Sequence, residues 1–196
     1  MPKIVDHDLQ RTKFAEAAIR LIARDGFEAM TMRAVAAEAG LSYGSLFHYF
    51  DSKDELLMQA VRHSTSQQTQ RVNDFSTHYS GLTALKHLLC DDAIVSDASR
   101  DDSVVWLAFL YKAALKEPFS TMHEELISGW LDRIEKLIRD AQKAGEVSDD
   151  RDAAFEAMAV WVYSAGISQQ GLLHPKRLKP KMQRNLIGAY LDKLRK

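Results

Sequence analysis

The sequence predicts an all-α protein of about nine helices, with a small three-helix head in front of a larger helical body. Three observations predict this fold class. Apolar residues recur at helical spacing along most of the chain, and no stretch shows the alternation of a strand between turn residues. Glycine and proline are few, nine and four residues, and several of them lie between the periodic segments, where they separate one helix from the next.

Composition excludes several classes of protein. The 196 residues are 46% hydrophobic and 27% charged, which is enough apolar material for a core and excludes a disordered chain. The single cysteine, Cys90, cannot form an internal disulfide, which fits a reducing compartment. We find no uncharged apolar run near the roughly 20 residues of a membrane span, and no signal-peptide core after Met1. The predicted location is the cytoplasm, with no membrane partner.

The first predicted helix runs from about Asp8 to Arg24, because its apolar residues form one stripe at helical spacing. Gly26 follows as its C-terminal cap. A short second helix is expected from its N-cap, Thr31, through Ala39. The residues expected to be buried in these two helices are Phe14, Ala17, Ala18, Leu21, Ile22, Val35, Ala36 and Ala39.

Gly40 ends the second helix, and Leu41 is expected to be a buried hinge residue. Ser42 caps a third short helix that reaches about Tyr49. A fourth helix starts near Lys53 after an Asp–Ser cap. Its apolar side is expected to contain Leu56, Leu57, Ala60 and Val61.

The remainder of the chain predicts a body of longer helices. A polar run at 64–70 continues the fourth helix as an exposed connector. Ser148-Asp149 opens a helix that is apolar on nearly all sides, which is typical of a buried helix or an oligomer interface. The predicted domains are a head at 1–55 and a body at 56–196. The five further helices are expected at about 82–94, 103–116, 120–144, 149–173 and 179–194.

Residues 31–53, with the sequence TMRAVAAEAGLSYGSLFHYFDSK, carry the functional signal. Two short helices joined by a glycine-containing turn are typical of a helix-turn-helix, whose second helix enters the major groove of DNA. No Asp or Glu lies between Ala39 and Phe50 to repel phosphate. The alternative interpretation of these side chains is a set of helix caps and a solvated helix face. The predicted contacts to double-stranded operator DNA are Thr31, Arg33, Ser42, Tyr43, Gly44, Ser45, His48, Tyr49 and Lys53.

The overall charge counts mildly against DNA binding, since the net charge is −1 and the head is not basic. We therefore expect modest non-specific affinity and a moderate dependence on salt.

The head resembles the TetR family of bacterial transcriptional regulators. The shared pattern covers roughly the first third of the chain, and the resemblance implies a three-helix DNA-binding head. It also implies a larger body that binds a small effector and dimerises through its last two helices. One departure is Phe47, where the family most often has a tyrosine that contacts phosphate. The matching residues are Gly26-Phe27, Thr31-Met32-Arg33, Val35-Ala36, Ala39-Gly40-Leu41-Ser42, Gly44, Leu46-Phe47, Tyr49-Phe50, Ser52-Lys53 and Leu56-Leu57.

A weaker resemblance links the body to the BetI-type branch of that family. This branch includes regulators of choline and betaine metabolism, but the same type of body serves other pathways and does not fix the ligand. The matching residues are 105–109, His123-Glu124-Glu125-Leu126, Trp130, Ala144-Gly145-Glu146, Gly171-Leu172-Leu173 and His174-Pro175.

The large aromatic residues of the body have two interpretations. They are core residues, or they line a pocket between helices for a mainly apolar or aromatic effector. A cage for a quaternary ammonium group is one form of such a pocket. The residues are Trp106, Phe109, Trp130, Trp161 and Tyr163.

Other chemistry finds no support in the sequence. The histidines show no metal-ligand spacing, and we find no phosphate loop, nucleophile elbow or nucleophile–base pair. We therefore predict no catalytic residue, metal or cofactor. The basic C-terminal residues are interpreted as a solvated helix face, with a DNA-binding tail as the alternative. They are Lys176, Arg177, Lys179, Lys181, Arg184, Lys193, Arg195 and Lys196.

Together these patterns predict a homodimeric regulator, a repressor that an effector releases from its operator. The alternative is a helical small-molecule-binding protein or enzyme whose head does not bind DNA. The sequence leaves open the effector, the operator and the sign of regulation.

Overall fold

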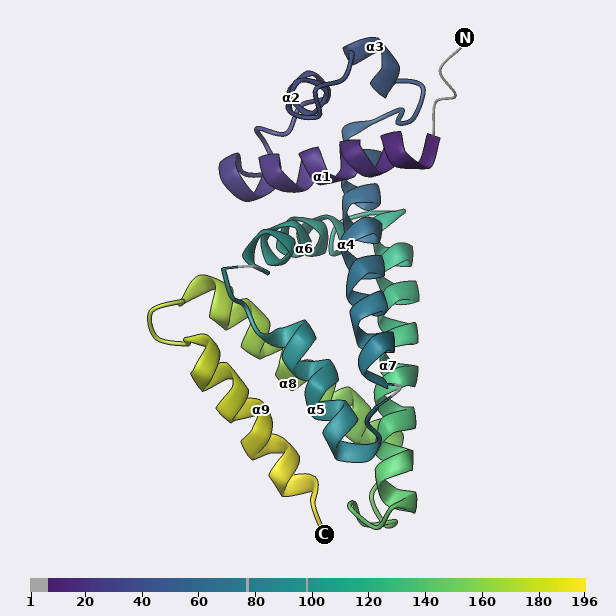
Figure 1. Cartoon of the computed structure of the whole chain (residues 1–196), viewed down its shortest axis with the longest axis vertical. Helices are drawn as coiled ribbons and strands as arrows, with labels where there is room; N and C mark the ends of the chain where they lie inside the picture. The colour runs from purple at the N-terminus through teal and green to yellow at the C-terminus, as the bar shows by residue number, and fades with distance from the viewer. Residues whose placement is uncertain (1–6, 77, 98) are drawn as a thin grey trace. The chain divides into compact units, whose positions relative to one another are not determined.

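The computed structural model describes residues 7–76, 78–97 and 99–196. The start of the chain, predicted to carry no signal segment, lies outside these residues. The described part forms α-helices, with one isolated antiparallel bridge between Val147 and Arg195, which confirms the all-α prediction. The helices are α1 (His7–Asp25), α2 (Met32–Glu38), α3 (Tyr43–Leu46), α4 (Lys53–Ser76), α5 (Gly81–Ala93), α6 (Arg100–Ala113), α7 (Phe119–Lys143), α8 (Ala153–Leu173) and α9 (Pro180–Leu194) (Figure 1).

The chain folds into two compact units. The first contains the described residues up to Gln67 together with Arg100–Phe119, and the second contains Gln68–Ser99 and Ser120–Lys196. Helix α6 therefore belongs to the same unit as α1, although more than 70 residues separate them in the sequence. The functional division after residue 55 stays a prediction.

In the first unit, α1 packs against both α2 and α6. The predicted stripe of α1 is buried, from Phe14 to Ile22. Phe14 meets Phe50 edge-on, with ring centroids 6.1 Å apart. Figure 1 shows α2 and α3 on one side of α1 and α6 on the other. This core supports the short helices α2 and α3.

The helix boundaries near residue 40 follow from side-chain caps and glycines. The Thr31 hydroxyl accepts a hydrogen bond from the Ala34 amide at 3.1 Å, and Ser42 does the same for the Ser45 amide at 3.1 Å. Gly40 has a φ of +67°, a conformation that glycine adopts without strain. These local signals position α2 and α3 where the sequence predicts them.

Several helix boundaries differ from the predictions. Helix α3 ends at Leu46, and a turn rather than helix continues to Tyr49. Helix α6 covers Arg100–Ala113 instead of 103–116, because Asp101 and Asp102 suit a first helical turn and Glu117 precedes a proline.

Helix α8 begins at Ala153, not at Ser148-Asp149. The carboxylate of Asp152 caps it, accepting from the amides of Ala154 at 3.0 Å and Phe155 at 3.3 Å. The Gln142 side chain donates to the carbonyls of Ser148 and Arg151, and thereby holds the preceding residues in a turn. Two burial predictions also fail, since Ala39 and Leu41 are only half-buried.

In the second unit, α5, α8 and α9 pack against one another, and α7 adds Ile134 and Ile138 to their core. Helices α8 and α9 run antiparallel (Figure 1). One buried polar side chain, Gln183 of α9, accepts from the Val95 amide at 2.8 Å and donates to the Leu178 carbonyl at 2.7 Å. It ties the loop after α5 to α9.

No helix in the described part of the chain combines the length and the apolar content that crossing a membrane requires. The eight basic residues of the predicted C-terminal cluster are all exposed.

Candidate DNA-binding surface and effector site

The predicted DNA contacts lie around α2, α3 and the turn that follows. Ser45, Tyr49 and Lys53 are half-buried. The other six are exposed: Thr31, Arg33, Ser42, Tyr43, Gly44 and His48. The fold therefore brings most of the predicted set to the surface of one short region.

The hydroxyl groups of this region differ in what they can offer. Thr31 and Ser42 use their oxygens to accept from backbone amides, and each keeps its proton for donation. Ser45 donates its proton to the Ser42 carbonyl at 2.7 Å. Thr31 and Ser42 are therefore better placed than Ser45 to donate to a phosphate oxygen.

An aromatic and cationic stack lies on the same region. The rings of Tyr43 and Phe47 meet edge-on, with centroids 5.0 Å apart and planes at 89°. The guanidinium carbon of Arg33 lies 5.5 Å from the Tyr43 centroid. Phe47 is absent from the predicted contacts, although its spacing of four residues from Tyr43 on an acid-free segment is a detectable signal.

Gly44 is exposed within α3, and a Cβ atom built there has no neighbour within 4 Å. The fold itself therefore has room for a side chain at this position. The small size of Gly44 suits the close approach of another molecule.

Tyr49 and Lys53 are already engaged within the first unit. The Tyr49 carbonyl accepts from Arg11 at 3.1 Å, and its ring packs against Phe14. The Lys53 ammonium lies 4.1 Å from the Phe27 ring centroid and donates to the Glu28 carbonyl at 3.3 Å. A phosphate would have to compete with these partners for Lys53.

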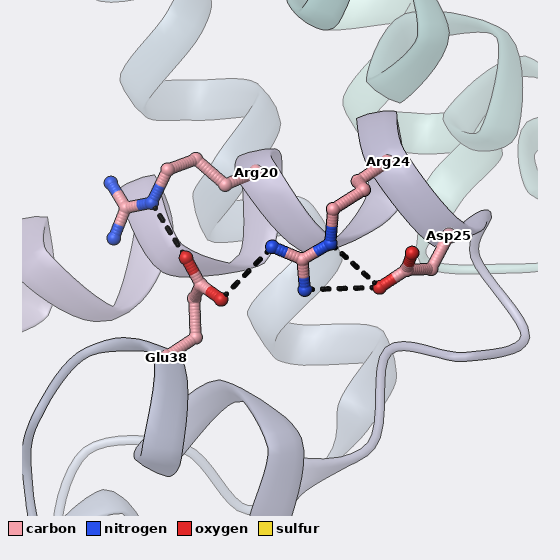
Figure 2. Close-up of polar contacts among 4 residues, drawn as sticks. All are labelled: Arg20, Arg24, Asp25 and Glu38. Carbon is pink, nitrogen blue, oxygen red and sulfur yellow. Dashed lines mark hydrogen bonds and ion pairs between the residues drawn. The ribbon is translucent and has the colours of Figure 1, made fainter.

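Two arginines of α1 are occupied by carboxylates, as Figure 2 shows. Arg20 bonds Glu38 at 3.0 Å, and Arg24 bonds both Glu38 at 3.3 Å and Asp25 at 3.0 Å. The hydrogen bonds from Arg20 and then Arg24 hold the pKa of Glu38 below its usual range. These pairs reduce the positive charge available to DNA, which fits modest non-specific affinity.

The predicted effector residues are divided between the two units. Phe109 of α6 is fully buried, with its ring centroid 5.2 Å from Trp106 and 5.9 Å from Phe119. Trp130, Trp161 and Tyr163 are partly buried against the core of the second unit. Phe109 is thus a core residue of the first unit. The convergence of all five on one cavity stays a prediction.

Polar groups accompany the aromatic residues of the second unit. Tyr163 stacks on Tyr190 at 4.8 Å and donates to the Leu186 carbonyl at 3.3 Å. The buried carboxylate of Glu156 is bound by Arg151 at 2.7 Å. Arg133 donates one nitrogen to Asn73 at 3.0 Å, while its buried Nη1 has no acceptor among the residues described.

The sequence matches two family models. One, described as bacterial regulatory proteins of the tetR family, matches residues 15–60. The other, described as the C-terminal part of a BetI-type transcriptional repressor, matches residues 81–196.

Two relatives match over nearly their whole length. The HTH-type transcriptional regulator PksA of Bacillus subtilis (strain 168) is 28% identical, with 99% of this chain and 94% of the relative covered. The HTH-type transcriptional regulator BetI of Vibrio atlanticus (strain LGP32) is also 28% identical, with 98% and 95% covered.

Two solved structures show the same fold. A transcriptional regulator from Saccharomonospora viridis in complex with choline superposes with a TM-score of 0.86 at 23% identity, covering 94% of this chain and 96% of that one. A SmeT–triclosan complex has a TM-score of 0.79 at 19% identity, covering 96% and 92%.

Proposed function

Because the chain belongs to the TetR family of transcriptional regulators and has a BetI-type C-terminal part, we propose how it acts on DNA. It binds an operator as a homodimer, represses transcription there, and leaves the operator when a small molecule binds its body. The observation that carries the proposal is the exposed, acid-free surface formed by α3 and its flanking turns.

On this surface the nine predicted residues contact different parts of the DNA. Tyr43, Gly44 and Ser45 face the base edges, and His48 flanks them. The hydroxyls of Thr31 and Ser42 donate to phosphate oxygens, since their protons remain unused by the caps. Arg33, Tyr49 and Lys53 reach the backbone on either side.

The homodimer forms through α8 and α9. Helix α8 exposes a helical stripe of apolar side chains, including Phe155 at 68% and Val162 at 57% exposure. Such a stripe is costly in water and suits a four-helix contact across a two-fold axis. The remaining members are Met158 and Leu173 of α8 and Met182 of α9.

The effector is mainly apolar or aromatic. The aromatic residues of the body support this class, with Trp130, Trp161 and Tyr163 only partly buried. The unmatched Nη1 donor of Arg133 favours an uncharged molecule that carries a hydrogen-bond acceptor over a cation. A quaternary ammonium compound is the second candidate, since aromatic faces attract such cations and a relative of the same fold was solved with choline.

Release of the operator requires that the effector bind two conformations with different affinity. Linkage makes the effect reciprocal, so that operator DNA weakens effector binding by the same factor. For a typical coupling of about 1–3 kcal/mol this factor is about 5- to 150-fold.

The test is a gel-shift titration of the full-length protein on the DNA upstream of its own gene, with a scrambled duplex as control. Choline and triclosan serve as probes of the two effector classes, and tryptophan fluorescence reports their binding. Without a probe, the protein should shift the operator duplex. One of the two probes should release the duplex from the protein. No preference over the scrambled duplex, together with ligand binding, would favour the helical small-molecule-binding protein instead.

A further inference from the structure

Phe47 lies directly after α3 and leaves 46% of its surface exposed. Its neighbours Leu46 and Phe50 are buried in the core of the first unit, so the segment turns Phe47 outward while it anchors both sides. A phenylalanine side chain has no donor or acceptor. Toward a polyanion, which brings no cation to its face, the exposed ring can therefore gain free energy by covering other apolar atoms.

The orientation of this ring is set before a partner arrives. Tyr43 meets it edge-on at 5.0 Å, and Arg33 of α2 covers Tyr43 with its guanidinium group at 5.5 Å. Edge-to-face geometry is a favoured arrangement of aromatic pairs. A side chain that is ordered beforehand loses less conformational entropy on binding.

The charge around Phe47 selects the kind of partner. Residues 39–50 contain no carboxylate, and Glu38 just before them is bound by Arg20 and Arg24. A polyanion can therefore approach the ring without repulsion from this segment. The room beside Gly44, three positions away, allows that approach to be close.

In the major groove of DNA the apolar group on the base edges is the C5-methyl of thymine. We propose that Phe47 packs against the C5-methyl of one thymine in each operator half-site, and so is a specificity-determining residue. The inference rests on the proposed function, since it requires the head to bind operator DNA.

The experiment begins with a duplex that the full-length wild-type protein selects from a random-sequence pool. Each thymine in turn is replaced by deoxyuracil, which pairs identically but lacks the methyl group. Dissociation constants come from fluorescence anisotropy at one fixed salt concentration. We expect one thymine per half-site whose replacement weakens wild-type binding about fourfold, the value of one buried methyl-sized group.

Phe47→Ala should bind the thymine and uracil duplexes equally at that position, and Phe47→Leu should keep a reduced preference. His48→Ala is the matched control. His48 directly follows Phe47, and its substitution should lower the affinity for both duplexes by the same factor. Circular dichroism and sedimentation verify that the variants fold and dimerise.

Two results separate the inference from its premise. If Phe47→Ala keeps the wild-type preference for thymine over uracil, even with weaker binding to both duplexes, the ring packs on deoxyribose or only shapes the head, and the inference is wrong. If the wild-type protein enriches no duplex, the proposed function fails and the inference fails with it.

Discussion

The α2–α3 region and the α8–α9 pair differ in helix length and in the kind of side chain that they expose. Helix α3 spans only Tyr43–Leu46 and depends on the Ser42 cap and on buried neighbours such as Phe50. Helix α8 spans Ala153–Leu173 and has apolar residues on its buried face and on its exposed face. The short region exposes groups suited to DNA, whereas the long pair exposes groups suited to another protein surface.

This difference predicts where substitutions act. Exposed changes near α3 should alter binding and leave stability intact. Exposed changes on α8 should alter assembly, and changes to the buried polar residue of α9 should alter folding.

The largest expected effect comes from a charge in the α8 stripe. Phe155→Asp should give a monomer at micromolar concentration in sedimentation, because a buried interface would have to bury the carboxylate. Operator affinity should fall by about a hundredfold or more, the scale of losing a second linked site. Leu115→Asp is the control, because Leu115 is also a large exposed apolar side chain but lies in the first unit. A Phe155→Asp dimer would place the interface elsewhere.

Next in size is the buried polar clamp of the second unit. Gln183→Leu should lower the free energy of unfolding by about 2–4 kcal/mol, because the Val95 amide and the Leu178 carbonyl lose their partner. Urea denaturation at one fixed protein concentration measures it. The exposed Gln170→Leu should change stability by less than about 0.5 kcal/mol. Equal effects of the two substitutions would contradict the clamp.

Tyr43→Ala tests the α2–α3 side of the comparison. Operator affinity should fall about tenfold or more, since a good contact to DNA is worth about 1–3 kcal/mol. The thermal midpoint should stay unchanged because the side chain is exposed. Tyr111→Ala, an exposed tyrosine on α6, should leave affinity unaltered. Unchanged binding by Tyr43→Ala would remove this residue from the site.

A pH effect is expected from Asp92 at the end of α5. Burial raises the pKa of Asp92 to about 6, the Gln68 hydrogen bond lowers it in part, and Asp91 raises it. The folded pKa thus exceeds the unfolded one, so the contribution of this group to stability is lost as pH rises from about 4 to about 6.

Asp92→Asn should therefore exceed the wild type in stability above pH 6, by about 2–3 kcal/mol for a shift of about two pKa units, with the difference vanishing near pH 4. Thermal unfolding across this range measures it, and the exposed Asp97→Asn is the control. A difference that is constant with pH would show that Asp92 is not the titrating group.

The smallest effect is expected for Lys53→Ala. Removal of one phosphate contact should lower the slope of log affinity against log salt by about one unit per subunit, equally for all DNA sequences. The contact energy is limited because Lys53 must leave Phe27 and Glu28. A loss confined to one sequence would mean that Lys53 reads bases.

The sequence predicts the starts of α2 and α3 and the break between them because their signals are local. Thr31, Ser42 and Gly40 each mark a boundary within three residues of where they act. The start of α8 escapes prediction because Ser148, Asp149 and Asp152 can all cap a helix. The hydrogen bonds from Gln142 decide among them, and that contact crosses from another helix.

The candidate sites also divide into residues that local sequence predicts and contacts that depend on the packing of separate helices. The predicted DNA contacts follow from a motif of 23 consecutive residues, from Thr31 to Lys53. The stack of Arg33 on Tyr43 and Phe47 depends on how α2 packs against α3, which periodicity does not encode. The roles of the aromatic residues of the body depend on contacts between helices far apart in the chain. The sequence therefore allows both a core role and a pocket role for Trp130 and Trp161.

The open space at Gly44 has an evolutionary consequence. A single substitution to alanine there adds a methyl group to α3 without displacing any atom of the fold. A duplicated gene could therefore acquire a new base preference at position 44 in one mutational step, while stability and assembly are inherited unchanged. Divergence of operators among paralogues would then start at this glycine.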